Sequence, residues 1–232
     1  MTASEIIKKL KKLGSAKNVA GMARFGIITK KAFGVAHPDI DKLAREIGKN
    51  HGLAQELWLS QVHDARILAG QIDRPEWVTA KQMDSWTRDF DSWGVCDSTC
   101  MHLFSRTTLA HKKVWQYAKS NKEYIRRTSF ALMAALAVHD KKAGDSDFIK
   151  FFPLIKEYAT DERNYVRKAV NWALRQIGKR NFKLNKKAIK LAREIIKIDS
   201  RAARWIAADA LHELKSEAIK QKLARARKNN EQ

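Results

Sequence analysis

Two similar stretches of the sequence lie 41 residues apart, YIRRTSFALMAAL at residues 124–136 and YVRKAVNWALRQI at residues 165–177. In each, an aromatic residue, a β-branched residue and two basic residues lead into a helix rich in small residues. A third stretch, RAARWIAADALHEL at residues 201–214, matches the second at an offset of about 37 through Arg204 and Leu211. A period of about 40 residues with two helices per repeat is typical of HEAT-like and armadillo-like arrays. The repeats therefore predict a helical solenoid with a concave surface, and an irregular helical bundle is the alternative.

The rest of the chain carries the same helical pattern. Apolar residues recur at helical spacing nearly throughout, and proline occurs only at positions 38, 75 and 153. We therefore expect an all-α protein in which residues 1–232 form one repeat domain, with a frayed tail at residues 225–232. The length is ample for a substantial core.

Local signals place several helix boundaries. Thr2 and Glu5 have the spacing of a capping box, and Pro38 with Asp39 opens a segment that runs to Gly48. The polar stretch HDKKAGDSD at residues 139–147 is predicted to be a loop between helices.

The charge of the chain points to a polyanionic partner. Lys and Arg number 46 against 25 Asp and Glu, which gives a formal net charge of +21 and a pI near 10.1. That excess is far more than solubility requires, although a generally basic protein without such a partner is the alternative. With 44% hydrophobic residues, the chain is not a disordered basic tail.

Residues 164–193 hold ten basic residues and no acidic one. Because like charges four residues apart oppose helix formation, we interpret the cluster as a phosphate-binding surface, while any single member is equally explained as a solvated residue. The ten residues are Arg167, Lys168, Arg175, Lys179, Arg180, Lys183, Lys186, Lys187, Lys190 and Arg193.

Other classes of function find little support. Cys96 and Cys100 are expected to be reduced thiols packed in a helix, since neither a disulfide framework nor zinc-ligand spacing is present. We expect no metal site and no cofactor. The first residues lack the apolar core of a secretory signal, and the longest apolar run, at residues 130–138, is too short to span a bilayer. We expect a cytoplasmic protein that does not contact membranes.

Trp93 and Asp97 lie four residues apart in FDSWGVCDSTC, so an indole and a carboxylate would project from one face of a helix. Taken singly, a Trp in a helical pattern is more often part of the core, an Asp is more often solvated, and an Arg in a repeat is more often structural. Arg127 and Trp172, however, occupy equivalent helices of adjacent repeats, where both can reach one concave surface. We therefore take these four residues as one candidate catalytic set.

Four short motifs, in order, resemble the bacterial DNA alkylation repair glycosylases of the AlkD type. They are GMARF followed, after twelve intervening residues, by a proline, and then SWGVCD, YIRR and YVRKAVNWALR. The resemblance covers roughly residues 20–215. It implies a HEAT-like solenoid that holds duplex DNA in a basic concave groove, which agrees with the repeats and the charge.

The resemblance also implies roles for single residues. Asp97 matches the catalytic aspartate, Trp93 and Trp172 match two tryptophans that pack against the deoxyribose, and Arg127 matches an arginine beside that site. Arg175 matches a basic residue near the DNA backbone. The other residues that we expect to contact DNA are Arg167, Lys168, Lys179, Arg24 and Phe25.

The chain departs from the family's best-known member near its start. Phe25 stands where that member has a tyrosine, so one hydroxyl is lost while the aromatic surface is kept. Polar and basic DNA contacts of that member are also missing from residues 36–41.

The implied reaction is hydrolysis of the N-glycosidic bond of 3-methyladenine or 7-methylguanine in duplex DNA. Alkylation makes these bases cationic and therefore good leaving groups, so little acid catalysis is needed. A carboxylate such as Asp97 can stabilise the oxocarbenium-like sugar and orient the attacking water, and indole faces add cation–π attraction. The resemblance further implies that the lesion stays in the base stack, unlike in glycosylases that flip their target.

Two other functions compete with a monofunctional glycosylase. A solenoid that binds bent, branched or damaged DNA without catalysis would share the charge, although retention of all four candidate residues argues against it. A protein-binding HEAT adaptor is disfavoured by the cationic surface. RNA is harder to exclude from charge alone. We expect a monomer that works on duplex DNA in the bacterial nucleoid.

Overall fold

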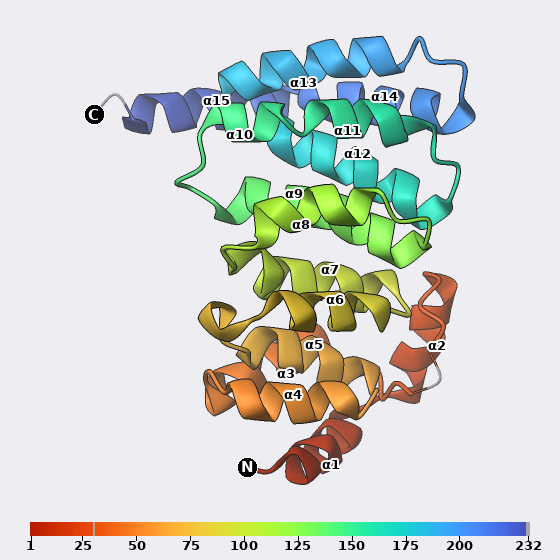
Figure 1. Cartoon of the computed structure of the whole chain (residues 1–232), viewed down its shortest axis with the longest axis vertical. Helices are drawn as coiled ribbons and strands as arrows, with labels where there is room; N and C mark the ends of the chain where they lie inside the picture. Colours follow the sequence, from red (N-terminus) through yellow and green to blue (C-terminus); the bar gives the residue numbers. More distant parts are fainter. Residues whose placement is uncertain (30, 231–232) are drawn as a thin grey trace. The chain divides into compact units, whose positions relative to one another are not determined.

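The computed structural model describes residues 1–29 and 31–230, except the side chains of residues 227–230. All regular structure in these residues is helical, which confirms the all-α prediction. The helices fall into two compact units, Met1–Leu109 and Ala110–Gln232 (Figure 1). Each unit is described by itself, so a single domain over the whole chain stays a prediction.

The first unit consists of seven α-helices and two short 3₁₀ helices within its described residues. They are α1 (Ala3–Leu13), α2 (Ala16–Arg24), α3 (His37–Ile47), α4 (His51–Leu59), α5 (His63–Ile72), η1 (Pro75–Trp77), α6 (Ala80–Arg88), α7 (Trp93–His102) and η2 (Phe104–Arg106).

Helix α5 is the centre of the first unit. It packs against α3, α4 and α7, and nearly all of its residues are buried. The buried carboxylate of Asp64, in its first turn, accepts hydrogen bonds from the backbone N–H groups of Phe33 (2.7 Å) and Val35 (2.8 Å). A side chain of α5 therefore fixes the segment that joins α2 to α3, because these buried N–H groups need an acceptor.

The second unit contains eight α-helices and one 3₁₀ helix in its described part. They are α8 (Ala110–Ala118), α9 (Glu123–His139), α10 (Asp145–Ile149), α11 (Phe152–Glu157), η3 (Tyr158–Thr160), α12 (Asn164–Gly178), α13 (Phe182–Ile195), α14 (Arg201–Leu214) and α15 (Glu217–Asn230).

The helices of the second unit form two rows. The inner row consists of α9, α12 and α14, each packed on the next, and the outer row consists of α8, α11 and α13, packed against the inner one (Figure 1). Helix α9 is buried from Arg127 through Ala137, since it has neighbours on both sides. This explains the apolar run at residues 130–138, which belongs to a core helix.

Successive repeats meet at equivalent positions. Tyr124 begins the first repeat and Tyr165 the second, and their rings stack with centroids 5.7 Å apart. At the opposite end of α12, Gly178 permits close packing, since a Cβ there would lie 2.7 Å from Leu214 Cδ2 and 2.9 Å from Ala188 Cβ. The 41-residue offset thus identifies residues that are in contact, as a HEAT-like repeat requires.

Glutamates at the start of α9 and just before α12 cap the next helix of the inner row. Glu123 accepts from the backbone N–H of Tyr165 at 3.2 Å, and Glu162 accepts from the N–H of Ala202 at 3.0 Å. These N–H groups lie in the first turns of α12 and α14, where they have no partner within the helix. The hydrogen bond to Ala202 is the main cause that lowers the pKa of Glu162 below its ordinary value.

Most of the predicted boundaries are confirmed, and one needs correction. The capping box of Thr2 and Glu5 is present, and α3 ends at the C-cap Gly48, whose φ is 72°. The predicted loop at residues 139–147 is too long, because α10 already begins at Asp145. Asp147 explains the difference, since its carboxylate accepts from the N–H of Gly144 and starts the helix.

The expected fraying at residues 225–232 falls mostly outside the described side chains. Helix α15 continues to Asn230, and residues 231–232 are outside the described part. Among the described residues, no helix is both long and apolar enough to cross a membrane.

Candidate functional site

Trp93 and Asp97 lie one turn apart on α7, as the sequence predicts. Ser92 caps the helix by accepting from the N–H of Val95, so Trp93 is its first residue. Both Trp93 and Asp97 are half-buried. Cys96, between them, is fully buried on the face that packs into the unit. An indole and a carboxylate therefore share the partly exposed face of α7.

The indole of Trp93 is held by a hydrogen bond to the segment that follows α2. Its Nε1 donates to the backbone carbonyl of Phe25 at 3.0 Å, directly after α2. Phe25 is 74% exposed, and Arg24 beside it is also exposed. The structure thus brings the GMARF motif to Trp93 and leaves Arg24 and Phe25 accessible to a ligand.

Gly94 explains how α7 comes so close to its neighbours. A Cβ at this position would lie 3.2 Å from Ile27 Cδ1 and 3.4 Å from His63 Cε1, which is tighter than ordinary contact. His63 is buried, and burial lowers its pKa, so the imidazole is neutral at pH 7.

In the second unit, α12 carries the predicted basic and aromatic residues on one stripe. Lys168, Trp172, Arg175 and the C-cap residue Lys179 follow spacings of four, three and four residues, which place them on one helical face. Lys168 is exposed, and the other three are half-buried. We call these four residues the α12 stripe.

Two cations of the α12 stripe are already paired with one carboxylate of α14. Arg175 Nη1 and Lys179 Nζ each donate to Glu213 at 2.6 Å, and Arg175 Nη1 lies 3.4 Å from Asp209. Partial burial raises the pKa of Glu213, but the hydrogen bond and charge of Lys179 and the charge of Arg175 bring it below the ordinary value. Glu213 therefore neutralises part of the positive charge that the sequence analysis expected DNA phosphates to neutralise.

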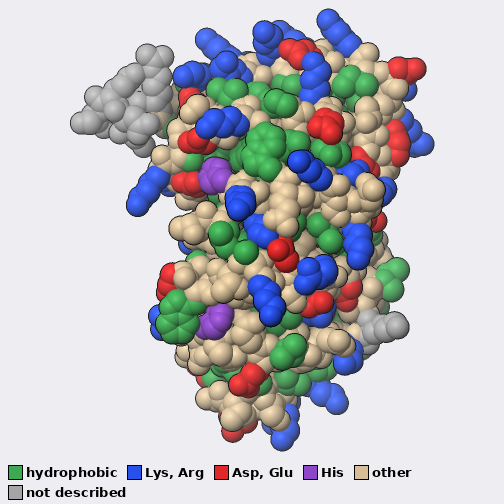
Figure 2. All heavy atoms as spheres, viewed as in Figure 1, with side chains coloured by type: hydrophobic (Ala, Val, Ile, Leu, Met, Phe, Trp, Pro, Cys, Tyr) green, Lys and Arg blue, Asp and Glu red, His purple; other side chains and the backbone are tan. Residues whose placement is uncertain are grey.

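The ten basic residues of the cluster also do not share one helix or one row. Half of them lie on α13, in the outer row, and are exposed; Figure 2 shows Lys and Arg side chains gathered over α13 at the top of the view. Arg180 has a structural role, because it donates to the carbonyls of Ala137 and Ala143 and covers the ring of Phe148 at 4.0 Å. The ten residues therefore lie on two rows of helices, and phosphate binding by the cluster stays a prediction.

Arg127 is buried in α9 rather than presented on a surface. It is 5% exposed, and its Nη1 donates to the backbone carbonyl of Tyr165 on α12. This is the structural role expected of an arginine within a repeat. Trp93 and Asp97 lie in the first unit and Arg127 and Trp172 in the second, so the structure describes the two pairs separately.

Arg167 leads to a residue that the sequence interpretation missed. Its guanidinium lies 5.1 Å from the ring centroid of Trp205 on α14, and Trp205 is an exposed tryptophan. The pairs Arg167–Trp205, Asn171–Asp209 and Arg175–Glu213 all have an offset of 38 residues. The offset of about 37 that the sequence offers falls one residue short of these partners, so only the structure identifies them.

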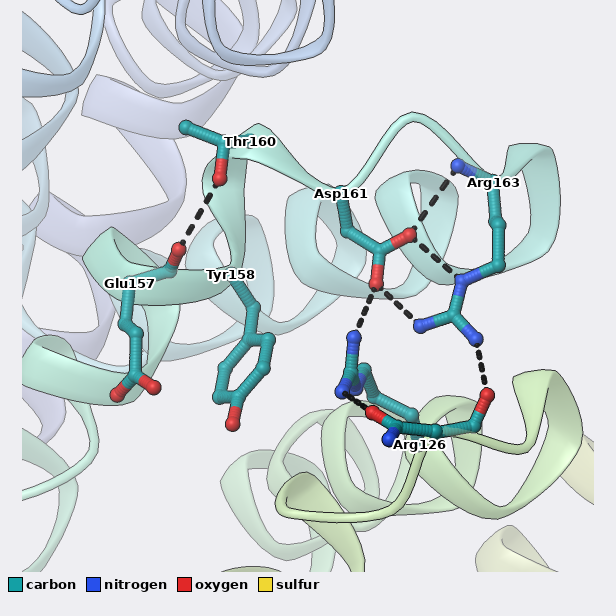
Figure 3. Close-up of a pocket in the computed structure, with 7 residues that line it drawn as sticks. Arg126, Glu157, Tyr158, Thr160, Asp161 and Arg163 are labelled. Carbon is teal, nitrogen blue, oxygen red and sulfur yellow. Dashed lines mark hydrogen bonds and ion pairs between the residues drawn. The ribbon is translucent and has the colours of Figure 1, made fainter.

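An open hollow of about 400 Å³ lies at the start of α12 (Figure 3). Asp161, 7% exposed in its side chain, accepts from both Arg126 and Arg163, which also donate to Asn121. Arg126 further lies 4.6 Å from the ring of Tyr158. Because the two guanidiniums already share a buried carboxylate, the hollow is a junction between repeats and offers little to an anionic ligand.

Comparisons with known proteins agree with the fold. One solved structure matches with a TM-score of 0.76 at 20% identity, covering 90% of this chain and 94% of that one; it belongs to a family of proteins related to the HEAT-like repeat DNA glycosylases, with affinity for branched DNA structures. A designed armadillo repeat protein bound to a (KR)4 peptide matches at 12% identity with a TM-score of 0.39, over 81% of this chain and 79% of that one. No curated protein matches the sequence.

The sequence profile of one protein family, described as DNA alkylation repair enzyme, matches residues 6–214. The match includes α7 with Trp93 and Asp97, the α12 stripe and all of α14. The chain belongs to the DNA alkylation repair enzyme family.

Proposed function

We propose that this protein is a monofunctional DNA glycosylase that hydrolyses the N-glycosidic bond of cationic alkylpurines, 3-methyladenine and 7-methylguanine, in duplex DNA. The observation that carries the proposal is the geometry of α7. Trp93 and Asp97 share one face, and the indole is fixed by its hydrogen bond to the carbonyl of Phe25. Membership in the DNA alkylation repair enzyme family supports the same reaction class.

Asp97 is proposed to act on the sugar rather than on the base. When the bond from C1′ to the base nitrogen breaks, its electron pair neutralises the cationic base, and positive charge develops on the sugar. A carboxylate about 4 Å from a full charge gains about 4 kcal/mol at an effective dielectric constant of about 20. Water then adds to C1′, its proton passes to the carboxylate or to solvent, and the products are a free base and an abasic site.

The aromatic and cationic residues are proposed to bind the DNA. Trp93 in the first unit and Trp172 in the second are tryptophans whose faces suit a developing positive charge. Lys168 on the α12 stripe is exposed and suits a phosphate, while Arg175 and Lys179 would share theirs with Glu213. Arg24 and Phe25 add a contact from the first unit.

The test is release of free base from duplex DNA that carries 7-methylguanine. We expect Asp97→Asn to lower the single-turnover rate by a factor of about 100 to 1,000, which is typical of losing one electrostatic stabiliser. Trp172→Ala is expected to lower it about tenfold, since one cation–π contact is worth about 1 kcal/mol. Asp91→Asn is the matched control, because Asp91 is exposed and lies just before α7. If Asp97→Asn releases base as fast as wild type, the proposal fails.

A DNA-binding protein without catalysis is the second candidate. The solved relative with a TM-score of 0.76 belongs to a family with affinity for branched DNA. A four-way junction bound at least tenfold more tightly than a duplex of equal length, without release of 7-methylguanine, would favour this candidate. Equal affinity for the two DNAs, with base release that depends on Asp97, would favour the glycosylase.

A further inference from the structure

The outer row of the second unit contains a hollow of about 720 Å³ that the proposed reaction does not use. It lies between α8, the segment after α9, and α10. Its volume is within the range of about 300–1,000 Å³ typical of small-ligand sites. Its lining includes His111, Lys112, Trp115, Asp140, Lys142, Asp147, Lys150 and Phe151.

An exposed indole stands in this hollow. Trp115 is 41% exposed, whereas Phe151 beneath it is 1% exposed. The ring centroids of Trp115 and Phe151 lie 6.2 Å apart, and His111 stacks on the same Phe151 ring at 5.7 Å. Phe151 thus supports both rings from below and restricts how they move. Trp115 is therefore a rigid aromatic surface left open to solvent.

The cations of the hollow remain accessible, while its carboxylates are engaged. Asp140 contacts Nε2 of His111 at 3.0 Å and accepts from the N–H groups of Lys142 and Ala143. Burial raises the pKa of Asp140, but these hydrogen bonds bring it below the ordinary value.

Asp147 is likewise occupied, by Lys150 and by the N–H of Gly144. Lys112 and Lys142 are exposed, and neither is paired with a carboxylate in the described part of the chain. The ammonium groups are thus the charges that a ligand would meet first.

The surroundings extend this positive charge. Lys187 and Lys190 line a neighbouring hollow of about 430 Å³ between α11 and α13, where Lys156 is paired with Glu194 at 2.8 Å. Figure 2 shows hydrophobic side chains in the upper half of the view with Lys and Arg side chains around them. An aromatic platform followed by a line of cations is the arrangement that binds single-stranded nucleic acid, whose bases stack on aromatic rings and whose phosphates follow the charge.

We propose that the hollow around Trp115 binds an unpaired stretch of nucleic acid, with a base stacked on Trp115 and flanking phosphates at Lys112 and Lys142. Duplex DNA does not fit this role, because its bases are stacked on each other and present no face to an indole. An acidic peptide would leave the indole unused. The site lies on α8, the segment after α9 and α10, and it includes no residue of α7 or of the α12 stripe, so it can be tested separately from the glycosylase.

The test is fluorescence anisotropy of labelled dT12 with the full chain at 100 mM salt. Trp115→Ala should weaken binding about tenfold or more, since stacking of one base contributes about 1–3 kcal/mol. Lys112→Gln with Lys142→Gln should also weaken it and reduce the salt dependence. Both variants should bind a 20-base-pair duplex within twofold of wild type and keep the wild-type melting temperature.

Two control variants make the same kinds of substitution in the first unit. Trp77→Ala removes an exposed tryptophan of the first unit, and Lys8→Gln with Lys12→Gln removes two exposed charges from α1. Neither should change dT12 affinity by more than twofold. Equal losses in the control and test variants would overturn the proposal, because binding would then depend only on total charge or on any exposed indole.

A photochemical experiment locates the contact directly. An oligonucleotide with one 5-iododeoxyuridine, irradiated in the complex and digested, should yield an adduct on the peptide that contains Trp115. Adducts confined to α12 or α14 peptides would overturn the proposal, since the strand would then occupy the α12 stripe. Displacement of dT12 by a poly-glutamate peptide at equal charge concentration would also overturn it, since the site would then bind any polyanion.

Discussion

Replacing Glu213 with Gln tests whether the α12 stripe faces DNA phosphates. The carboxylate accepts from Arg175 Nη1 and Lys179 Nζ, both at 2.6 Å, and its side chain is 27% exposed. Gln keeps the size of the side chain and one acceptor oxygen but removes the negative charge. Two cations that now share one carboxylate would then be available to phosphates.

The expected gain follows from counterion release. Loss of one negative charge corresponds to about one more phosphate neutralised, which steepens the slope of log K against log salt by about 0.9. At 50 mM salt, this corresponds to about tenfold tighter binding of duplex DNA, and the advantage shrinks about threefold between 50 and 200 mM. Stability should fall by about 1–2 kcal/mol, since hydrogen bonds to charged groups are weakened.

Fluorescence anisotropy of a 20-base-pair duplex at 50, 100 and 200 mM salt measures both quantities. Glu217→Gln on α15 removes the same charge from a carboxylate that pairs with exposed Lys220, at 3.4 Å. Equal gains from the two variants would show a general effect of net charge. Weaker binding by Glu213→Gln would refute the reasoning, because the carboxylate would then be needed to orient the two cations.

Three further predictions concern stability, measured by urea denaturation. Asp161→Ala should lower the free energy of unfolding by about 3 kcal/mol, because two guanidiniums lose a buried partner. Burial raises the pKa of Asp161, but hydrogen bonds from Arg163 and Arg126 bring it below the ordinary value. The wild type should therefore keep this contribution to stability above about pH 4 and lose it as the pH falls further. The free energy of unfolding of Asp161→Ala should fall less over the same pH range. Gly178→Val should cost about 1–3 kcal/mol through contact with Ala188, whereas Gly21→Ala, with nothing within 4 Å of the new Cβ, should stabilise α2 by about 0.5–1 kcal/mol.

The structural elements that the sequence predicts well depend on contacts between residues that are close together in the sequence. The capping box of Thr2 and Glu5 joins residues three apart, and the end of α3 at Gly48 depends on one backbone conformation. The repeat offset also predicts contacts between residues far apart in the chain, because Tyr124 and Tyr165 occupy the same position of two repeats and stack on each other. Local pattern and period therefore predict the helical class and these boundaries.

The candidate site depends on contacts that no period describes. The hydrogen bond from Trp93 to the carbonyl of Phe25 joins residues 68 apart in the chain, across helices of different lengths. Gly94 reads in the sequence as a weak point of a helix, yet the space it leaves is taken by Ile27 and His63. Arg127, which the sequence offers as a surface cation, is buried because α9 has neighbours on both sides. Each of these outcomes depends on three-dimensional packing.

The net charge of +21 is a poor guide to where DNA would bind, because the repeat pairs many of its own cations. Arg175 and Lys179 both donate to Glu213 of α14. Arg180, just after α12, donates to the carbonyls of Ala137 on α9 and of Ala143 in the segment after α9. The cations left accessible include Lys168 on the inner row and the exposed lysines of α13 on the outer row. A polyanion should therefore find positive charge on both rows of the second unit. The free energy of binding should follow these accessible cations rather than the total charge, so substitutions at Lys168 and at Arg180 should differ in their effect on DNA affinity although each removes one charge.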